Sequence, residues 1–317
     1  MTVQLTAKSY RKALGETLVE LGLRNSDVVV LDADTARSTG TFAFAEMFPH
    51  RFFNIGISEQ DLISTAAGMA IAGLLPVAVA FASFMMRGWE QIRNTVARDR
   101  LNVKLVGTHA GLSAHIDGSS HQALEDLALT RVLPGFTVVS PADAIATREL
   151  LRCALEEVVG PVYVRLGRDN ALEVYERGDS LRLGRASVLR DGEDVLVVAC
   201  GPMVRIALEA SKLAEKVGLR AMVVDLHTIK PPDSRALVEH ARRTGCVLTL
   251  EEHSVVGGLG STVAEVLSEE YPVPLRRIGI RESFGTSARS YEELLAHYGL
   301  TPEKVLDEII KLIKQKR

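Results

Sequence analysis

Residues 52–81 read FFNIGISEQDLISTAAGMAIAGLLPVAVAF, and this stretch decides the fold. A strand-like run, FFNI, leads into a helix of small apolar residues, and PVAVAF follows as a second strand. Gly73 and Pro76 separate the helix from that strand. The uncharged run of residues 62–86 is long enough to span a bilayer. Because these two residues break it, we expect a buried helix and a buried strand, and no membrane span.

The same alternation of strand and helix continues along the chain. The strand-like runs DVVVLDAD, RFFNIG, PVAVAF, VKLVGTH, FTVVS and PVYVRL are separated by amphipathic stretches, which predicts parallel strands joined by crossover helices. After a polar segment the pattern restarts with DVLVVACG, RAMVVDLH, CVLTLEEH and PLRRIGI. We predict an α/β protein of two three-layer domains with mostly parallel sheets, residues 1–168 and 186–317, joined by a linker at residues 169–185.

The composition argues against several classes of protein. A formal net charge of −3 on 317 residues, with KLIKQKR as the basic run, provides no electrostatic footprint for nucleic acid. The three cysteines are odd in number and lack CxxC spacing, which argues against a disulfide framework and a zinc site. They favour a reducing, cytoplasmic location. The N-terminus also lacks the apolar segment of a secretory signal.

Polar and aromatic side chains follow the predicted strands at the points where the strands end. Ligands of open parallel sheets bind at these carboxyl ends. In chain order the residues there are Asp32, Asp34, Glu59, Phe81, Phe84, His109 and Arg168. The loop THAGLSAHIDGSSHQALED at residues 108–126 adds His115, Asp117 and His121. These loop residues could bind a metal, could be solvated, or could recognise hydroxyl and phosphate groups. We favour the last, because the spacing matches no known helical pair of metal ligands.

Glu59 has two explanations at this stage. It begins a helix behind Ser58, where the helix dipole favours an acid and a serine cap contributes about 1 kcal/mol. Alternatively, a carboxyl group between apolar walls, with Phe81 and Phe84 nearby, suits a flat and basic heterocycle. The second explanation requires a site that disfavours the carboxylate anion.

Two long segments resemble known enzymes. IGISEQDLISTAAGMAIAGLLPVAVAFASFMMRGWEQIRN and DGSSHQALEDLALTRVLPGFTVVSPAD resemble the pyrimidine-binding domain of transketolase and 1-deoxyxylulose-5-phosphate synthase. DLHTIKPPD and EEHSVVGGLGSTVAEVL are similar to their C-terminal domain. The resemblance covers nearly the whole chain and implies the thiamine diphosphate superfamily.

The resemblance also implies roles for individual residues. Glu59 would be a protonated carboxyl group on the ring nitrogen of the aminopyrimidine, so that the exocyclic amine can act as a base in its imino form. Phe84 would stack on the pyrimidine ring, and Phe81 would pack against the edge of that ring. Asp34 matches an acidic residue near the cofactor. His109, Asp117 and His121 would act on substrate hydroxyls. Ser38 and Arg168 would hold the sugar phosphate.

Two further features look functional in isolation, but we predict structural roles for them. GGLGST at residues 257–262 lacks the full dinucleotide fingerprint and the later acid, so it predicts a tight strand-to-helix turn. His227 is predicted to be a satisfied packing residue.

The missing motifs predict a partner. In the family a GDG segment and an Asn pair hold the cofactor diphosphate through a metal, and this sequence has neither. The resemblance therefore implies the C-terminal subunit of a split transketolase. Thiamine diphosphate would lie between this chain and an N-terminal partner subunit, which would hold Mg²⁺ or Ca²⁺. Self-association through residues 62–71 would give two copies of each subunit.

Three alternatives stay open from the sequence. The chain could be a free-standing fragment of a deoxyxylulose-phosphate synthase, because FASFMMR fits that enzyme equally well. It could be the beta subunit of a 2-oxo-acid dehydrogenase, or a homologue that has lost catalysis. The DGSSHQ loop favours sugar phosphates over an acyl-transfer partner, and we expect a two-carbon ketol transferase.

Overall fold

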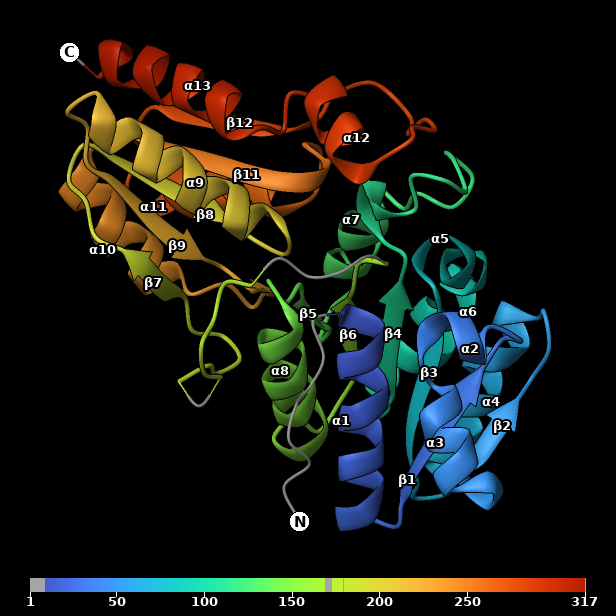
Figure 1. Cartoon of the computed structure of the whole chain (residues 1–317). Coiled ribbons are helices and arrows are strands. Elements are labelled where there is room, and N and C mark those ends of the chain that lie inside the picture. The colour runs from blue at the N-terminus through green and yellow to red at the C-terminus, as the bar shows by residue number, and fades with distance from the viewer. Residues whose placement is uncertain (1–8, 169–172, 179, 317) are drawn as a thin grey trace.

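The computed structural model describes residues 9–168, 173–178 and 180–316, and its strands form two sheets (Figure 1). The first sheet has the order β10-β5-β6-β4-β3-β1-β2. Its strands are β1 (Val28–Asp32), β2 (Phe52–Asn54), β3 (Leu75–Phe81), β4 (Lys104–Thr108), β5 (Thr137–Val139), β6 (Val162–Arg165) and β10 (Thr228–Lys230). All pair in parallel except β10, which is antiparallel to β5.

Helices cover both faces of this sheet. Helices α1 (Tyr10–Arg24), α3 (Phe42–Met47) and α8 (Ala144–Glu156) share one buried core with strands β1 and β3. The opposite face carries α4 (Glu59–Ile71), the π-helical η3 (Ile92–Ala97) and α7 (Asp126–Arg131). Short turns connect these elements: α2 (Ala36–Thr39), η1 (Pro49–Arg51), α5 (Ala82–Met85), η2 (Met86–Gly88), α6 (Trp89–Gln91) and η4 (Gly111–Ser113). Gly73 lies between α4 and β3 as predicted, whereas Pro76 is the second residue of β3.

The second sheet has the order β12-β11-β8-β9-β7. Its strands are β7 (Ser187–Arg190), β8 (Val195–Ala199), β9 (Ala221–Asp225), β11 (Val247–Ser254) and β12 (Leu275–Ile280), and β7 alone among them is antiparallel. Helices α9 (Met203–Lys216) and α13 (Pro302–Gln315) pack on one face. Helices α10 (Ser234–Thr244) and α11 (Leu259–Glu270) pack on the other, and α12 (Tyr291–His297) follows β12. Two three-layer α/β units with mostly parallel sheets are therefore confirmed.

The two units share one hydrophobic core. The cluster that contains Leu31 and Leu105 of the first sheet also contains Val198 and Val224 of the second. A buried ion pair lies at the same junction, with Arg165 Nε 2.9 Å from an Asp126 carboxylate oxygen. Arg165 also donates a hydrogen bond of 2.9 Å to the backbone carbonyl of Glu252 on β11. Packing and polar contacts thus fix the two sheets against each other.

In the described part of the predicted linker, residues 173–178 and 180–185, no helix or strand is present. Residues 169–172 and 179 of that linker, and residues 1–8 of the first predicted domain, lie outside the described residues. No helix in the described part of the chain combines the length and the apolar character needed to cross a membrane.

Candidate active site

The segment that follows β1 is organised by Asp32. Its carboxylate is buried and accepts hydrogen bonds from the backbone N–H of Thr35 at 2.5 Å and from the hydroxyl groups of Thr39 and Thr41 at 3.0 and 2.9 Å. Burial raises the pKa of Asp32, and these hydrogen bonds oppose the shift. Asp32 therefore has a structural role: it shapes the turn that carries Asp34 and Ser38.

Asp34 lies at the edge of the sheet with a left-handed backbone, φ 63°. Its carboxylate accepts a hydrogen bond of 3.0 Å from the side-chain amide of Asn54, which ends β2. Arg37 follows closely in the sequence and could have been its partner, but the Arg37 guanidinium lies 4.0 Å from the centre of the Phe42 ring. Asp34 is therefore positioned by the neighbouring strand.

Glu59 is the first residue of α4, and its side chain is only 4% exposed. Ser58 occupies the N-cap position, but its side chain makes no capping hydrogen bond within the described helix. The carboxylate lies 3.3 Å from the guanidinium of Arg87, whose own side chain is 65% exposed. The predicted burial of Glu59 is observed, whereas this cation partner was not foreseen, because Arg87 reaches the helix start only through the fold.

Four aromatic rings gather around the end of β3 and α5, which packs against α4. Phe81 and Phe84 stack with centroids 5.5 Å apart and an interplanar angle of 22°. His109 stacks on Phe81 at 3.7 Å, and His121 contacts Phe84 at 5.0 Å with its ring turned by 67°. Two predicted groups, the aromatic pair and the histidines of the loop, therefore form one cluster.

His109 is the most perturbed titratable group of this cluster. Burial, with the positive charges of Arg168, Arg11 and His121 nearby, lowers the pKa of His109 to about 3. Its Nδ1 lies 3.0 Å from the hydroxyl of Thr108. His109 is therefore a neutral ring at physiological pH, able to exchange hydrogen bonds with a hydroxyl group but not to carry a positive charge.

Two arginines define a positively charged side of the site. Arg168 forms an ion pair with Asp117 at 3.1 Å. Arg11, on α1, donates a hydrogen bond of 3.2 Å to the backbone carbonyl of Ser38. The Nε of Arg11 is buried without a hydrogen-bond partner among the described residues. Sequence reasoning missed Arg11, although YRKAL places two cations at the start of a helix whose other face is apolar.

The described residues contain no group of three or more His, Cys, Asp and Glu side chains arranged to hold a metal ion. Within the loop, Asp117 is paired with Arg168, and the Nδ1 of His121 lies 3.0 Å from the hydroxyl of Ser120. The Nδ1 of His115 lies 3.3 Å from the carbonyl of Ser113. In the described structure, the side chains of His115, Asp117 and His121 thus take part in hydrogen bonds and one ion pair that shape the loop.

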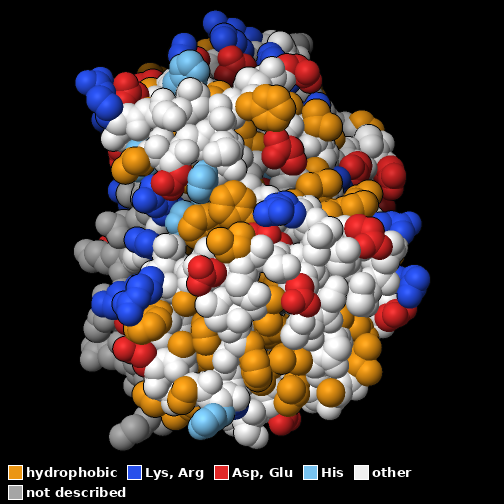
Figure 2. Space-filling model, turned by 90° about the vertical axis from the view of Figure 1, so that its right-hand side faces the viewer, with side chains coloured by type: hydrophobic (Ala, Val, Ile, Leu, Met, Phe, Trp, Pro, Cys, Tyr) orange, Lys and Arg blue, Asp and Glu red, His pale blue; other side chains and the backbone are white. Residues whose placement is uncertain are grey.

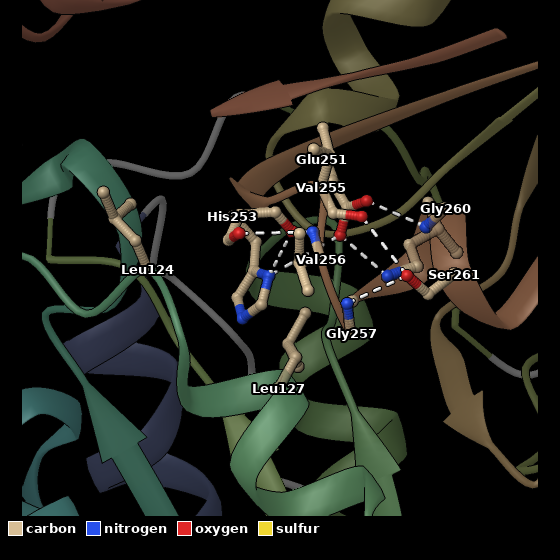
Figure 3. A network of polar contacts seen from close by, with 12 residues as sticks. Leu124, Leu127, Glu251, His253, Val255, Val256, Gly257, Gly260 and Ser261 are labelled. Atoms are coloured by element: carbon tan, nitrogen blue, oxygen red, sulfur yellow. Dashed lines mark hydrogen bonds and ion pairs between the residues drawn. The ribbon is translucent and has the colours of Figure 1, made fainter. Parts of the chain in front are cut away.

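The GGLGST segment forms the strand-to-helix turn that was predicted. The carboxylate of Glu251 on β11 accepts hydrogen bonds of 2.7 and 2.8 Å from the N–H groups of Leu259 and Gly260, which begin α11 (Figure 3). A Cβ at Gly260 would lie 2.9 Å from that carboxylate, so glycine permits the close approach. Burial raises the pKa of Glu251 to about 7. The backbone N–H groups of this turn therefore bind the carboxylate of Glu251, a residue of the same chain.

His227 is fully buried between β9 and β10. Its Nδ1 lies 3.0 Å from the Thr228 hydroxyl, whereas its Nε2 has no hydrogen-bond partner among the described residues. Burial lowers the pKa of His227 to about 4. The burial expected of a packing residue is observed, but the prediction that its polar atoms would be satisfied holds for one ring nitrogen only.

Comparison with known proteins supports the same assignment of the two units. Residues 6–172 match the family model described as transketolase, pyrimidine binding domain, and residues 184–305 match that described as transketolase, C-terminal domain. A protein of Methanocaldococcus jannaschii named as a transketolase C-terminal section is 42% identical over 97% of both chains. An apulose-4-phosphate transketolase subunit of Phocaeicola vulgatus is 38% identical over 96% of this chain and 97% of its own length.

A solved structure and a longer relative complete the comparison. The structure, described as a split gene transketolase, inactive beta4 tetramer, superposes with a TM-score of 0.90 at 50% identity and covers 98% of this chain and 99% of its own. The 1-deoxy-D-xylulose-5-phosphate synthase of Thermomicrobium roseum is 34% identical over 97% of this chain but only 49% of its own length. The chain belongs to the transketolase family of thiamine diphosphate-dependent enzymes and corresponds along its length to the C-terminal subunit of a split transketolase.

Proposed function

We propose that this chain, with its domains divided at residues 169–185, works as the C-terminal subunit of a two-subunit transketolase. The enzyme transfers a two-carbon ketol unit from a ketose phosphate to an aldose phosphate. The observation that carries the proposal is a buried carboxylate at the start of α4, near an aromatic pair that itself contacts two histidines.

The residues present fit the pyrimidine half of thiamine diphosphate. Phe84 is partly exposed on α5, which packs against α4, and the one ion-pair partner of Glu59 in the described residues, Arg87, is 65% exposed. Glu59 would hold a proton at the pyrimidine ring nitrogen, Phe84 would stack on the ring, and Phe81 and Asp34 would line its surroundings. The cofactor, when bound, supplies a thiazolium carbon that becomes the nucleophile.

The neighbouring polar residues fit a phosphorylated sugar. Asp117 and His121 would bind its hydroxyl groups and exchange protons with them, and His109 would hydrogen-bond to them as a neutral ring. Arg168 and Ser38 would hold the phosphate, and Arg11 joins them because its buried Nε lacks a hydrogen-bond partner in the described structure. The related transketolase chain of Phocaeicola vulgatus is named for apulose-4-phosphate, which also carries a phosphate.

An N-terminal transketolase subunit would complete the site. It would contribute the segment that binds the cofactor diphosphate through Mg²⁺ or Ca²⁺, because this sequence has no GDG. Thiamine diphosphate would then lie between the two subunits. We place the assembly in the cytoplasm, in keeping with three buried cysteines that are all free thiols.

Self-association would occur through residues 62–71. Along α4, Leu62, Ile63 and Ala66 are buried in the chain's own core, whereas Ile71 is 72% exposed and Ile57, just before the helix, is 75% exposed. Hydrophobic side chains gather on the lower part of the face shown in Figure 2. Two copies of each subunit would follow, and the related solved structure is described as a beta4 tetramer.

A second candidate is 1-deoxyxylulose-5-phosphate synthesis. FASFMMR is as similar to the synthase as to transketolase, and the synthase of Thermomicrobium roseum is 34% identical over 97% of this chain. In that reaction pyruvate would be the donor, and carbon dioxide would be released.

Reconstitution tests both candidates. The purified chain is mixed with a matching N-terminal subunit, thiamine diphosphate and Mg²⁺, then supplied with a ketose phosphate and an aldose phosphate, or with pyruvate and the aldose phosphate. We expect ketol transfer only in the complete mixture and no release of carbon dioxide from pyruvate. Robust transfer by this chain alone would contradict the two-subunit proposal, and pyruvate-dependent product would replace it with the second candidate.

A further inference from the structure

The second α/β unit reaches across to the loop that carries the predicted substrate residues. Residues 284–288, between β12 and α12, are called the clamp segment here, and residues 109–122 the substrate loop. The N–H of Ala288 donates a hydrogen bond of 3.2 Å to the carbonyl of His115. The side-chain amide of Gln122 donates one of 2.9 Å to the carbonyl of Thr286. In Figure 1 the segment before α12 lies over the loop that leads into α7.

The two segments approach so closely that a side chain at either of two glycines would collide with the opposite segment. A Cβ on Gly285 would lie 1.7 Å from the side-chain oxygen of Gln122, and one on Gly118 would lie 2.8 Å from the hydroxyl of Ser287. Gly285 is not among the described glycines with a positive φ, so its backbone would accept alanine. Packing against Gln122, and not backbone conformation, therefore demands glycine at position 285.

The tip of the clamp segment reaches the neighbourhood of the aromatic pair. Phe284 is 83% exposed, and its backbone carbonyl accepts a hydrogen bond of 2.8 Å from the hydroxyl of Tyr298. Phe284 lines a hollow of about 250 Å³ together with Ser83, Met86 and Ser120. These residues are sequence neighbours of Phe84 and His121, so the clamp segment stands at the rim of the candidate site.

The second unit also holds the first turn of the substrate loop. The buried carboxylate of Glu252 on β11 accepts a hydrogen bond of 2.7 Å from the N–H of Leu112. A Cβ on Gly111 would lie 2.4 Å from the other oxygen of that carboxylate. The loop is thus fixed near its beginning by β11 and near its end by the clamp segment, and Asp117 lies between these two attachments.

We propose that the clamp segment is a positioning element for the substrate. It acts through the substrate loop, by its contacts with His115 and Gln122. By fixing Gln122 and the backbone of His115, it sets the places of Asp117 and His121 for the sugar. The proposal rests on the proposed function and gives the C-terminal domain a share in sugar recognition. Cofactor activation at Glu59 lies outside the reach of these contacts.

The main test is Gly285→Ala in the enzyme assembled with its N-terminal partner. The new Cβ displaces Gln122, and a shift of about 1 Å in a positioned group can cost on the order of 10²-fold. We expect the KM for the ketose phosphate to rise by about 10- to 100-fold with a smaller fall in kcat. Hydrogen–deuterium exchange at the thiazolium carbon of the bound cofactor should stay at the wild-type rate.

Two further variants separate positioning from general damage. Gln122→Ala in the Gly285→Ala background removes the oxygen that the new Cβ meets, so we expect the KM to return part of the way to the wild-type value. Arg289→Ala is the matched control, because Arg289 follows the clamp segment directly, is 93% exposed and pairs with Glu293 of the next helix, α12. Its KM should be unchanged.

Amide hydrogen exchange provides a readout that needs no activity. In the isolated chain, Gly285→Ala should raise deuterium uptake in residues 109–122 and leave α4 as in the wild type. Wild-type uptake in that loop together with a wild-type KM would overturn the proposal. The proposal would also be overturned if Gly285→Ala slowed hydrogen–deuterium exchange at the thiazolium carbon in proportion to the rise in KM. If the wild-type assembly transfers no ketol units, the proposed function is refuted. The amide hydrogen exchange of residues 109–122 would then still test the clamp segment.

Discussion

Replacing Glu59 by glutamine separates catalysis from stability. The change keeps the size of the side chain and replaces a titratable carboxyl group with an amide that cannot act as an acid or a base. The ion pair that it breaks joins the buried Glu59 to a guanidinium that is 65% exposed. Because the arginine left behind stays in water, the change leaves no unpaired buried charge, and it should cost less than about 1 kcal/mol of folding free energy. Loss of a group that transfers a proton typically slows a reaction by about 10²–10⁴-fold, or about 3–5 kcal/mol of barrier. The effect on chemistry should therefore exceed the effect on folding several-fold.

The assay is hydrogen–deuterium exchange at the thiazolium carbon in the assembled enzyme, saturated with thiamine diphosphate and quenched with acid. Asp61→Asn is the matched control, since Asp61 lies in the same first turn, is exposed and bonds only the Thr65 hydroxyl at 3.1 Å in the described structure. It removes the same charge near the same helix dipole. His121→Ala should weaken the steps that involve sugar and leave the exchange near normal. Exchange at the wild-type rate in Glu59→Gln would return that residue to a helix-start role.

Three other variants test the remaining electrostatics. Arg87→Gln removes the guanidinium that lies 3.3 Å from the Glu59 carboxylate. The assembled enzyme should therefore bind thiamine diphosphate a few-fold more tightly, as measured by a fluorescence titration. Weaker binding would show that Arg87 itself holds the cofactor. Arg165→Met leaves the carboxylate of Asp126 buried without its guanidinium and should cost about 3–5 kcal/mol in urea unfolding, a loss that Asp126→Asn in the same chain should reduce. Burial raises the pKa of Asp225 from 3.8 to about 8. Between about pH 4 and pH 8 the folded state therefore keeps a proton that the unfolded state has lost. The free energy of unfolding should fall as the pH rises through this range. Asp225→Asn should therefore raise the melting temperature at pH 9 more than at pH 5, and an equal change at both values would rule out this titration.

Burial on both faces made some strands easy to predict, although β2 and β12, which are mostly half-buried, were also predicted. In β1 and β8 every residue is buried, which gives the unbroken apolar runs that the sequence displays. The two antiparallel edge strands, β7 and β10, were not predicted. Ser187–Arg190 mixes intermediate and exposed positions, and Thr228–Lys230 has only three residues. Neither produces a hydrophobic pattern that stands out from a loop.

The residues of the candidate site also divide into those that could be predicted from the sequence and those that could not. Glu59 and Phe84 could be selected because the sequence around each is informative by itself. The contacts of Arg11 and Gln122 could not, because they join segments far apart in the chain. Gln122 and Thr286 are separated by 164 positions, and no local pattern encodes such a pairing.

The strand β10 has a consequence for the order in which the protein can be completed. Residues Thr228–Lys230 come from the second half of the chain, yet they pair with β5 at the edge of the first sheet. A ribosome makes the other six strands of that sheet long before it reaches residue 228, so the nascent sheet keeps an open edge at β5 throughout that interval. Closing this edge requires much of the second unit to have been synthesised. The N-terminal half is therefore a poor candidate for a truncated product, since it would expose a strand edge that the intact chain covers with its own later residues.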